Sequence, residues 1–491
     1  MGPKFMLLNL PNPPGRNIYR GNAGGFGTTG SISSKTLLPI YLIYAASALE
    51  NAGCNYKILD AQASGLDIQE VKRVVSKEKP DILLAWISLP SFYHDLKCLG
   101  EIKSLRKNIL IVAWGTVCNV MPEKVLFNDC VDVILRGEYP YYNAILTFAR
   151  KIKYNREFNF EDIPGATFVK ERRVFSNPAI DHELESLNNL SFSVYMKIPV
   201  HNYVDFFETT DGSKIGCIPI ITSAGCSHGC IYCPYPVGYG RKVKYKSVEN
   251  IIKEIEFLHD NFGINGFIFR DQNFTQNKKR VEKLCNEIIE RNLDIYWLVE
   301  ARADQVSKEL LSLMKKVGCF RIHFGVETGS SKLIDVSKPG SDLEKYKNAF
   351  KLCKELEIFT VAHLIIGLPG ESQETVQETL KFLYHLNPDN INLNIITPYP
   401  GTKLFKIATE KGWIVTSDWS KYTSHNAVMR TEDLDVKQIE ELKQYLKKSF
   451  VKFKIMHDSN YRKFFIKHLP RKLKNRLTLL LKKNMKNTKA S

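Results

Sequence analysis

The hydrophobic positions of residues 1–153 form short apolar runs that are separated by longer amphipathic segments. The apolar runs predict five strands, at 4–10, 55–60, 81–88, 108–115 and 131–137. The segments between and after them have helical periodicity, at 37–53, 66–78, 92–107 and 139–151. Apolar strands that alternate with amphipathic helices are typical of a mostly parallel sheet with helices on both faces. We therefore predict an α/β fold whose first domain is doubly wound and Rossmann- or flavodoxin-like.

The same alternation returns six times in the second half of the chain. Apolar runs predict strands at 218–222, 266–271, 294–301, 320–327, 358–367 and 390–397, and a helical pattern follows each of the first five. This pattern predicts a partial (β/α)6 TIM-like barrel, in which the chemistry lies where strands end and loops begin. The predicted domains are 1–153, a connector at 154–215, the barrel at 216–405 and a helical C-terminal region at 406–491.

The net charge of +17 is concentrated at the C-terminus. Residues 447–491 carry fifteen Lys or Arg and one acid, Asp458, which leaves the rest of the chain at +3. After Pro470, leucines at helical spacing lie between these basic residues, which predicts a basic helical tail. Two interpretations stay open: a helix packed on the barrel, or a helix at an anionic membrane surface. RNA is a weaker third candidate, because the tail has no interleaved aromatic residues past Phe465.

The remaining features indicate where the protein is located. No apolar run approaches the length of a membrane span, and the N-terminus lacks the shape of a secretory signal. We therefore expect a cytoplasmic protein, peripheral at the inner membrane surface if its tail binds lipid. The eight scattered cysteines of such a protein are interpreted as reduced, buried side chains.

A glycine-rich stretch, Gly25-Phe-Gly-Thr-Thr-Gly30, matches the G-x-G-x-x-G pattern of dinucleotide sites. In those sites the pattern follows its strand at once and opens a helix. Here it lies fifteen residues beyond the first strand, among Gly, Asn and Ser. We interpret it as a mobile loop and reject a nicotinamide site.

Three cysteines lie within eight residues directly after the first barrel strand: Cys226, Cys230 and Cys233. Attachment of a c-type haem requires C-x-x-C-H, but Pro234 follows the last cysteine. Structural zinc takes four ligands, and Cys217 or His228 is a candidate for the fourth. Iron–sulfur clusters are also held by cysteine thiolates. Three ligands on a four-iron cluster leave one iron open, as a catalytic site requires.

The C-x3-C-x2-C spacing, with Tyr232 before the last cysteine, resembles the cluster loop of the radical S-adenosylmethionine (SAM) enzymes. Other stretches, over roughly residues 4–405, are similar to the subgroup with an N-terminal cobalamin (B12)-binding domain. They are "LPSFYHDL" (89–96), "VMPEKVL" (120–126), "VDVILRGE" (131–138), "FRDQNFTQN" (269–277), "ARADQVSKELLSLMKKVGC" (301–319), "FGVETGS" (324–330), "IIGLPGES" (365–372) and "TPYPGT" (397–402).

The resemblance implies that the three cysteines ligate a [4Fe–4S] cluster and that SAM chelates its fourth iron. Reduction of the cluster then cleaves SAM to a 5′-deoxyadenosyl radical, which removes hydrogen from an unactivated carbon. The residues expected to contact SAM are Tyr232, Asp271, Arg302, Glu327 and Gly367. Of these, Asp271 would bind the methionine ammonium, and it is followed by Gln272 where the family often has a second acid.

For cobalamin the resemblance implies Ser91, Gly115, Gly137 and Glu138. The D-x-H-x-x-G string of histidine-ligated cobalamin is absent from the chain. The glycine pair of the family is Trp114-Gly115 here, and the tryptophan is large enough to crowd the corrin. Two alternatives stay open: cobalamin bound without a histidine ligand, or a domain that keeps the fold and has lost the cofactor.

We predict cobalamin-dependent methyl transfer to an unactivated carbon. The alternatives are cobalamin-independent radical carbon–carbon coupling or ring formation on a lipid or other hydrophobic metabolite, and a scaffold protein with a relic cluster loop. The expected partners are a one-electron donor of the flavodoxin or ferredoxin type and a small-molecule or lipid substrate. Nucleic acid is not expected, because the charge lies in the tail and not on the folded core.

Overall fold

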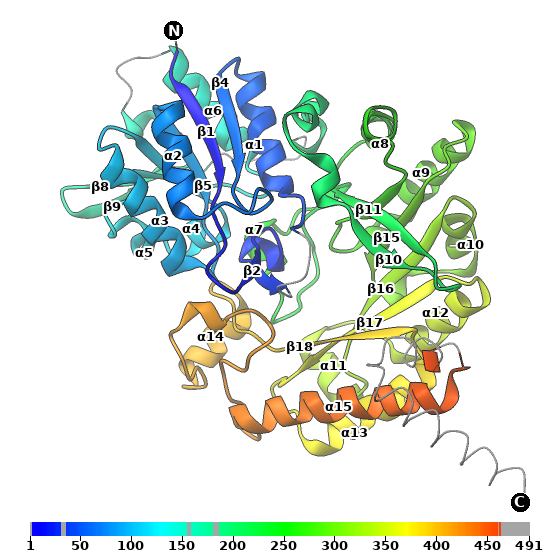
Figure 1. The fold of residues 1–491 in the computed structure, drawn as a ribbon. Coiled ribbons are helices and arrows are strands. Elements are labelled where there is room, and N and C mark those ends of the chain that lie inside the picture. The colour runs from blue at the N-terminus through cyan, green and yellow to red at the C-terminus, as the bar shows by residue number, and fades with distance from the viewer. Residues whose placement is uncertain (1, 31–35, 155–158, 180–185, 460, 463–491) are drawn as a thin grey trace, which may run out of the picture.

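The computed structural model describes residues 2–30, 36–154, 159–179, 186–459 and 461–462. Two seven-stranded sheets lie side by side, each with its own helices, and together they form an α/β molecule of two lobes (Figure 1). The predicted basic helix after Pro470 lies outside the described residues. In the part of the chain that is described, no helix is long and apolar enough to cross a membrane.

The first sheet has the strand order β4-β1-β5-β6-β7-β8-β9. Its strands are β1 (Lys4–Asn9), β4 (Asn55–Asp60), β5 (Ile82–Trp86), β6 (Leu110–Trp114), β7 (Val133–Leu135), β8 (Ala166–Lys170) and β9 (Arg173–Ser176). The five predicted strands run parallel, and β8 and β9 are antiparallel additions. From β1 the chain goes to β4 on one side of β1 and then crosses to β5 on the other side. The strand order therefore reverses between β1 and β5, which is the topological switch point.

Helices cover both faces of this sheet, as the periodicity predicts. One face packs against α1 (Ile40–Asn51) and α6 (Tyr142–Tyr154). The other packs against α2 (Ile68–Glu78), α3 (Phe92–Leu105) and α5 (Pro122–Leu126), with the short α4 (Thr116–Val120) after β6. The doubly wound prediction is confirmed.

The second sheet has the order β10-β11-β14-β15-β16-β17-β18. Its strands are β10 (Asp205–Glu208), β11 (Lys214–Ile220), β14 (Gly266–Phe269), β15 (Tyr296–Ala301), β16 (Cys319–Glu327), β17 (Phe359–Ile366) and β18 (Asn390–Ile395). All except β10 run parallel in sequence order. The connecting helices are α8 (Val248–Phe262), α9 (Lys278–Glu290), α10 (Lys308–Lys316), α11 (Ser331–Ser337), α12 (Leu343–Glu355) and α13 (Gln373–Leu386). This is the predicted partial barrel.

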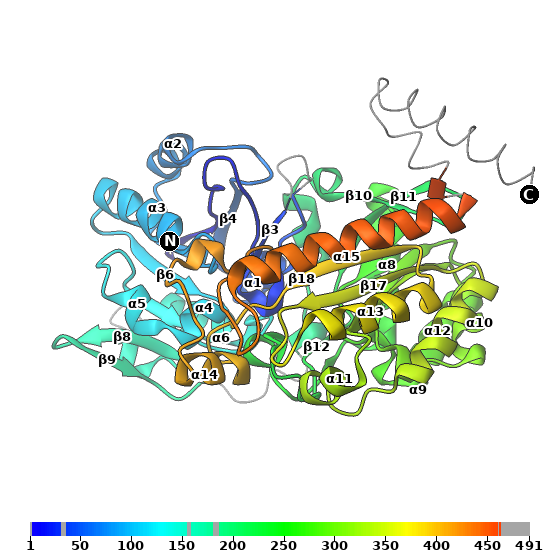
Figure 2. The ribbon, with the colours of Figure 1, turned by 90° about the horizontal axis from the view of Figure 1, so that it is seen from below.

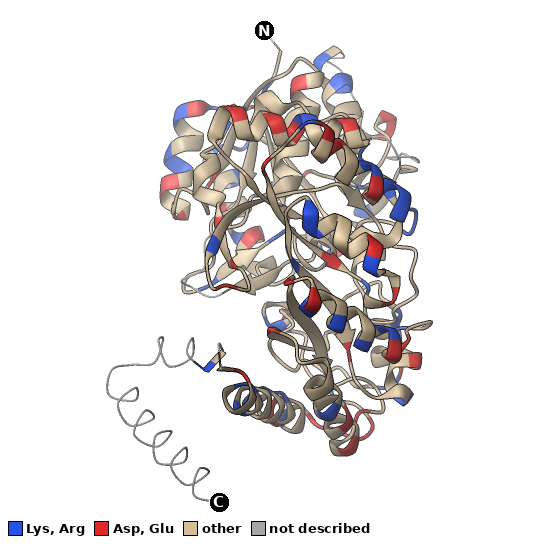
Figure 3. Cartoon of the chain, turned by 90° about the vertical axis from the view of Figure 1, so that its right-hand side faces the viewer, with Lys and Arg blue, Asp and Glu red and all other residues tan. Residues whose placement is uncertain are grey.

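The remaining elements join or cover the two lobes. Between the lobes lie the small hairpins β2–β3 (Asn17–Tyr19, Thr28–Gly30) and β12–β13 (Ser223–Ala224, Lys244–Tyr245), together with α7 (Tyr235–Gly238). Near the C-terminus, α14 (Lys403–Glu410) lies by the first lobe, and α15 (Val436–His457) packs along α13 and β18 (Figure 2). On the side of the second lobe drawn toward the viewer, Lys and Arg are interspersed with Asp and Glu (Figure 3).

Two segments differ from the sequence expectations. β8 and β9 continue the first sheet to residue 176, inside the stretch that we treat as a connector, because the buried positions of β8 pack beside β7 while β9 forms the edge. The glycine loop, defined here as residues 21–30, is interpreted as mobile from its composition but is packed between the lobes. Its glycines permit close approach: a Cβ on Gly24 would lie 2.5 Å from the Pro234 carbonyl oxygen.

A buried ion pair fixes α8 beneath the barrel. The helix begins at Ser247, whose side chain accepts from Asn250 N, and it carries Glu254 on its buried face. Glu254 accepts from Lys246 Nζ at 2.5 Å and from Tyr195 Oη at 2.6 Å. Both members of the ion pair are almost fully buried, with side chains 0% and 2% exposed.

Replacing Glu254 tests this pair. Glu254→Ala leaves the Lys246 ammonium buried without its carboxylate, so we expect a loss of about 3–5 kcal/mol in the free energy of unfolding. Urea denaturation measures it. Glu249→Ala on the same helix is the control, because Glu249 pairs with Lys253 at the exposed surface and its removal should leave stability unchanged. Equal effects of the two variants would contradict the account.

Candidate functional site

The three clustered cysteines open onto one cavity at the carboxyl ends of the barrel strands. This cysteine cavity has a volume of about 480 Å³ and is lined by Cys226, Cys230 and Cys233. Ends of β15, β16, β17 and β18 contribute to its wall, and Asn22, Ala23 and Thr28 of the glycine loop close it from the first lobe. The other eight cysteines do not line it. The cavity is therefore located where the barrel prediction expects chemistry.

Asp271 holds the start of the cysteine loop, residues 225–233. One oxygen of its buried carboxylate accepts from Thr222 N at 2.9 Å and Ser223 N at 2.8 Å. The other accepts from the hydroxyls of the same two residues, both at 2.6 Å. Four donors saturate the carboxylate, and Asp271 does not line the cysteine cavity. In this structure it anchors the loop, while its neighbour Gln272 lines the cavity.

Two further contacts set the path of the loop. Gly225 has a φ of +105°, and its N–H donates to Gln272 Oε1 at 2.9 Å. A Cβ at Gly225 would lie 2.5 Å from the Lys242 carbonyl oxygen, so only glycine fits. Cys226 N donates to the Gly240 carbonyl at 3.1 Å. The backbone therefore turns the three thiols into the cavity.

Burial disfavours thiolates here unless a cation compensates them. Desolvation raises the pKa of the Cys230 thiol, although nearby Lys338 opposes the shift. Burial, followed by the neighbouring Cys230, also raises the pKa of Cys233. Metal binding offsets the cost of burying a thiolate, since it favours the deprotonated form of the cysteine. Three thiols that open onto one cavity fit a metal cluster whose irons they would ligate separately.

The zinc alternative has a weaker basis in the geometry. Cys217 is buried against Ile268, Leu298 and Phe320 and does not line the cysteine cavity, so it cannot supply a fourth ligand. His228 does line the cavity. Among the described residues, no three His, Cys, Asp or Glu side chains converge as a mononuclear site requires. The cysteines of an iron cluster bind different irons and need not converge on one point.

Arg302, at the end of β15, lines the cavity with an unused donor. Its Nε and Nη2 donate to the two oxygens of Asp304 at 2.9 and 2.6 Å. Its Nη1 is buried and has no partner among the described atoms. A buried guanidinium N–H that lines a cavity is suited to a ligand carboxylate.

Glu327 and Lys338 form a buried pair on the same wall. Glu327 ends β16 with a φ of +65° beside a register shift, which directs it toward the cavity. Lys338 Nζ lies 3.2 Å from Glu327 Oε1 and also donates to the Gly325 carbonyl. Burial lowers the pKa of Lys338, but Glu327, Tyr346 and Cys230 together raise it more, so the net shift is upward and the ammonium stays charged. Tyr232 lines the cavity too, and burial and Glu327 raise its pKa.

Gly367 lies at the end of β17 but is not part of the cavity lining. Its φ is +89°, and a Cβ there would lie 3.1 Å from Ile396 and Ile439. Its N–H donates to Glu371, whose pKa burial raises to about 8. The glycine therefore lets α15 approach the strand ends from outside.

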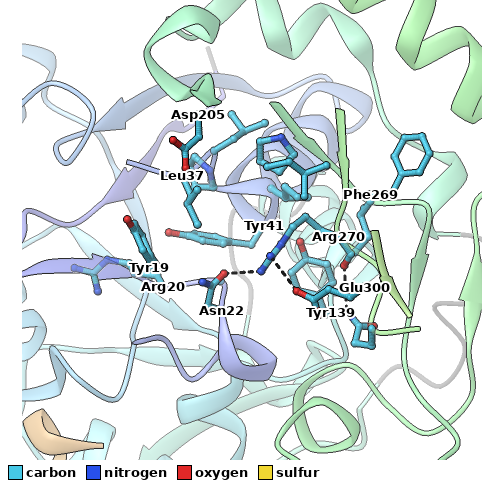
Figure 4. Close-up of a pocket in the computed structure, with 18 of the residues that line it drawn as sticks. Tyr19, Arg20, Asn22, Leu37, Tyr41, Tyr139, Asp205, Phe269, Arg270 and Glu300 are labelled. Carbon is cyan, nitrogen blue, oxygen red and sulfur yellow. Dashed lines mark hydrogen bonds and ion pairs between the residues drawn. The ribbon is translucent and has the colours of Figure 1, made fainter. Parts of the chain in front are cut away.

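A second cavity of about 220 Å³ adjoins the first; we call it the inner cavity (Figure 4). Six residues line both cavities: Asn22, Tyr235, Arg270, Gln272, Glu300 and His323. Arg270 Nη2 donates to Asn22 Oδ1 at 2.8 Å, and its Nη1 lies 3.5 Å from Glu300 Oε1. The rest of the lining is mainly apolar, from both lobes. The inner cavity therefore offers apolar walls with a charged boundary toward the cysteines.

Two histidines extend this boundary across the barrel. Arg321 Nε donates to His323 Nε2 at 2.9 Å, so the proton of the neutral ring is on Nδ1. That nitrogen lies 3.2 Å from His363 Nε2, and His363 Nδ1 lies 3.3 Å from the Asn392 amide. Burial lowers the pKa of both histidines. Burial also lowers the pKa of Arg321, to about 10, so the guanidinium keeps its charge at neutral pH. The pair is therefore neutral, and Arg321 sets the tautomer of His323.

Of the predicted cobalamin residues, none lines either cavity. Ser91 donates to Asp95 at 2.7 Å, and Gly115 packs under Trp86. The Gly137 carbonyl accepts from Asn119, and Glu138 pairs with Lys244.

The chain is similar to known proteins over both lobes. Residues 220–383 match the family described as the Radical SAM superfamily. An uncharacterized methyltransferase of Pyrococcus horikoshii is 27% identical over 92% of this chain and 93% of its own length. The anaerobic magnesium-protoporphyrin IX monomethyl ester cyclase of Cereibacter sphaeroides is 26% identical over 81% of this chain and 64% of its own length.

The fold is also similar to that of a solved structure. TsrM from Kitasatospora setae, a radical SAM methyltransferase with cobalamin and a [4Fe–4S] cluster bound, has a TM-score of 0.68 at 16% identity. The alignment covers 92% of this chain and 89% of TsrM. The two-domain architecture predicted from the sequence is confirmed, and the superfamily implies an iron–sulfur cluster and SAM as cofactors.

Sequence reasoning missed several residues of the cavities: Asn22, Arg270, Glu300, His323, Lys338 and His363. Glu300, Arg270 and the two histidines are polar positions inside apolar strands. Such positions inside predicted barrel strands are a signal that could have identified them.

The first prediction from this site concerns the loop anchor. In Asp271→Asn, the new amide NH2 faces groups that themselves donate, so at least one hydrogen bond to the carboxylate is lost. This loss should lower the free energy of unfolding by about 1.5–3 kcal/mol. We expect a lower melting temperature and less iron per chain after anaerobic reconstitution. Asp294→Asn, at an exposed position, is the control and should retain both. Full iron content in Asp271→Asn would refute the anchoring role.

The second prediction concerns the histidine pair. Burial lowers the pKa of His323 well below 6.5, so below about pH 6.5 the unfolded chain binds a proton that the folded chain does not. Stability should therefore fall as the pH drops from 6.5 toward about 5. Denaturant midpoints should fall less steeply in His323→Gln. The exposed His385→Gln should follow the wild type, and parallel slopes in all three proteins would contradict the assignment.

Proposed function

We propose that this chain, whose second domain belongs to the radical SAM superfamily, cleaves SAM and functionalises an unactivated carbon of a small-molecule or lipid substrate. One observation carries the proposal. Three thiols open onto a single cavity that has an unused arginine donor in its wall and no fourth cysteine in its lining. A scaffold protein with a relic loop has no need for such an arrangement.

The cavity residues have separate roles in this proposal. Cys226, Cys230 and Cys233 would hold the cluster, and Arg302 Nη1 would bind the methionine carboxylate. Glu327 would accept from the ribose hydroxyls. Tyr232 would pack beside the cluster as part of the same wall.

Asp271 enters the proposal with a different role from the one that the resemblance implies. Its four hydrogen bonds support an anchoring role, and Gln272 is the group beside it that reaches the cavity. Gly367 likewise supports the strand end by close packing and not by contact with the adenosine. Lys338 would keep a positive charge beside the three thiolates.

The bound cofactors supply the bond-breaking chemistry: one electron from the cluster splits SAM into methionine and a 5′-deoxyadenosyl radical, which takes a hydrogen atom from carbon. The chain positions the substrate and keeps water out. Ile365, Ile395 and Ile396 give the cysteine cavity an apolar side that would shield a radical. A one-electron donor of the flavodoxin or ferredoxin type would reduce the cluster.

The inner cavity is the proposed substrate site. Its apolar walls favour a hydrophobic molecule, while Arg270, Glu300 and His323 would orient a polar group next to the cysteine cavity. This combination suits a lipid or another hydrophobic metabolite that carries an oxygen function. Ring formation or carbon–carbon coupling on such a substrate is the reaction that the cavity supports best.

Cobalamin-dependent methyl transfer is the second candidate. The names of the Pyrococcus relative and of TsrM favour it, since both are methyltransferases and the TsrM structure contains cobalamin. It requires space for a corrin between the lobes.

Replacing one cluster cysteine tests the main proposal. In Cys230→Ala, anaerobically reconstituted and reduced with dithionite, we expect no 5′-deoxyadenosine and a loss of most iron, with the melting temperature little changed. Cys217→Ala is the matched control: Cys217 is buried outside the cysteine cavity, so this variant should retain both iron and 5′-deoxyadenosine formation. Undiminished 5′-deoxyadenosine formation in Cys230→Ala would refute the proposal, and metal loss in Cys217→Ala would restore the four-ligand zinc interpretation.

A further inference from the structure

The space between the lobes decides between the two candidate reactions. Ligands of doubly wound sheets lie beyond the carboxyl ends of the strands, where the strand order switches. In this chain the switch falls between β1 and β5, on the side that faces the barrel. We infer that the chain fills this place with its own glycine loop and that its first domain holds no corrin. The inference does not depend on SAM cleavage.

A buried polar network occupies the switch point itself. Arg20 Nη1 lies 2.5 Å from Asp95 Oδ2, with side chains 1% and 0% exposed. The same guanidinium donates to Ser91 Oγ at 2.9 Å and to Ser88 Oγ at 3.2 Å. Its Nη2 donates to the carbonyls of residues 10 and 11. The hydroxyl of Ser91, a predicted cobalamin contact, is therefore committed to an internal ion pair.

Aromatic rings fill the neighbouring strand ends. Trp86 and Trp114, the last residues of β5 and β6, have ring centroids 5.0 Å apart and are fully buried. Tyr141 lies 5.4 Å from Trp86 and 5.7 Å from Trp114, and Tyr41 lies 4.5 Å from Trp86. A Cβ on Gly115 would lie 2.7 Å from the Trp86 ring. The glycine that a corrin would approach is already covered by indole.

The glycine loop lies directly on these rings. Trp86 Nε1 donates to the Gly25 carbonyl at 3.2 Å, and Thr116 Oγ1 donates to the Gly24 carbonyl at 2.7 Å. An added Cβ at Gly25 would lie 2.5 Å from Thr116 Oγ1 and 2.8 Å from Trp86. One at Gly27 would lie 2.9 Å from Ser88. At Gly24, Gly25 and Gly27, loop and sheet edge are therefore in direct contact.

The other side of the loop contacts the barrel just as closely. A Cβ on Gly238, in α7, would lie 2.0 Å from the Gly24 carbonyl oxygen. Tyr139 of the first lobe stacks on Tyr239 with ring centroids 4.0 Å apart. First lobe, glycine loop and α7 therefore form three consecutive packed layers where a flat macrocycle would need a slot.

The remaining space is too small for a corrin. The inner cavity measures about 220 Å³, below the ~300–1,000 Å³ typical for drug-sized ligands, and a corrin with its nucleotide tail is larger than those. The cysteine cavity is needed for the cluster and SAM. The four residues expected to contact cobalamin lie outside both cavities.

The loop also replaces the cofactor as a wall of the reaction chamber. Asn22 accepts from Arg270 at the boundary of the two cavities, and Ala23 and Thr28 line the cysteine cavity. The first domain therefore acts as a support that positions this loop against the barrel.

Corrin retention tests the inference directly. The full chain is reconstituted anaerobically with iron, sulfide and excess hydroxocobalamin, desalted, and measured for corrin by absorbance after cyanide treatment. We expect no corrin beyond that retained by a protein without a corrin site, and unchanged 5′-deoxyadenosine formation when cobalamin is omitted. Retention of one corrin per chain would overturn the inference. Absence of 5′-deoxyadenosine in every sample would count against the proposed function and leave this inference standing.

A pair of variants tests the packing of the glycine loop. Gly25 and Gly212 share a φ of +84°, but a Cβ at Gly212 would meet no atom within 4 Å. Gly25→Ala should therefore lower the melting temperature and reduce 5′-deoxyadenosine formation several-fold relative to Gly212→Ala, because only Gly25 is clamped against Trp86 and Thr116. If the loop instead swings aside to admit a corrin, the two variants will behave alike, and that result would also overturn the inference.

Discussion

The carboxylate of Asp271 determines the geometry of the site. It lies two residues after β14 and accepts hydrogen bonds from four donors of Thr222 and Ser223, just after the chain leaves β11. This contact fixes the direction of the cysteine loop, and the next residue, Gln272, fixes Gly225. A carboxylate so buried costs free energy unless its hydrogen bonds are satisfied, and here Thr222 and Ser223, just before the loop, satisfy them, with Arg280 Nη1 3.8 Å from its Oδ2. The position of the three thiols therefore depends on Asp271 together with the contacts of Gly225 and Cys226.

A second constraint is the close packing of glycines between the lobes. Gly24, Gly25 and Gly238 let three backbone layers approach where any side chain would collide. This packing brings Asn22 to Arg270 and joins the inner and cysteine cavities through shared residues. Both lobes thus contribute to one reaction chamber, although the charged groups that surround the thiols all come from the barrel.

Local pattern predicted the elements well, because parallel strands between amphipathic helices have a strong periodic signal. It also located the cysteine loop, since spacing alone identifies a cluster of thiols. It did not find the contacts that depend on strand register, such as Arg321, His323 and His363 aligning across β16 and β17. The packing of the glycine loop was missed for a related reason: its partners, Trp86 and Pro234, are distant in sequence.

The account rests on the claim that the three cysteines leave one iron open for SAM. Electron–nuclear double resonance on the reduced protein tests this most directly, using SAM that carries an isotopic label in the methionine amino group. The account predicts a hyperfine coupling between the label and the cluster, present in the wild type and in Cys217→Ala. A correctly assembled four-iron cluster that shows no coupling to bound SAM would contradict it.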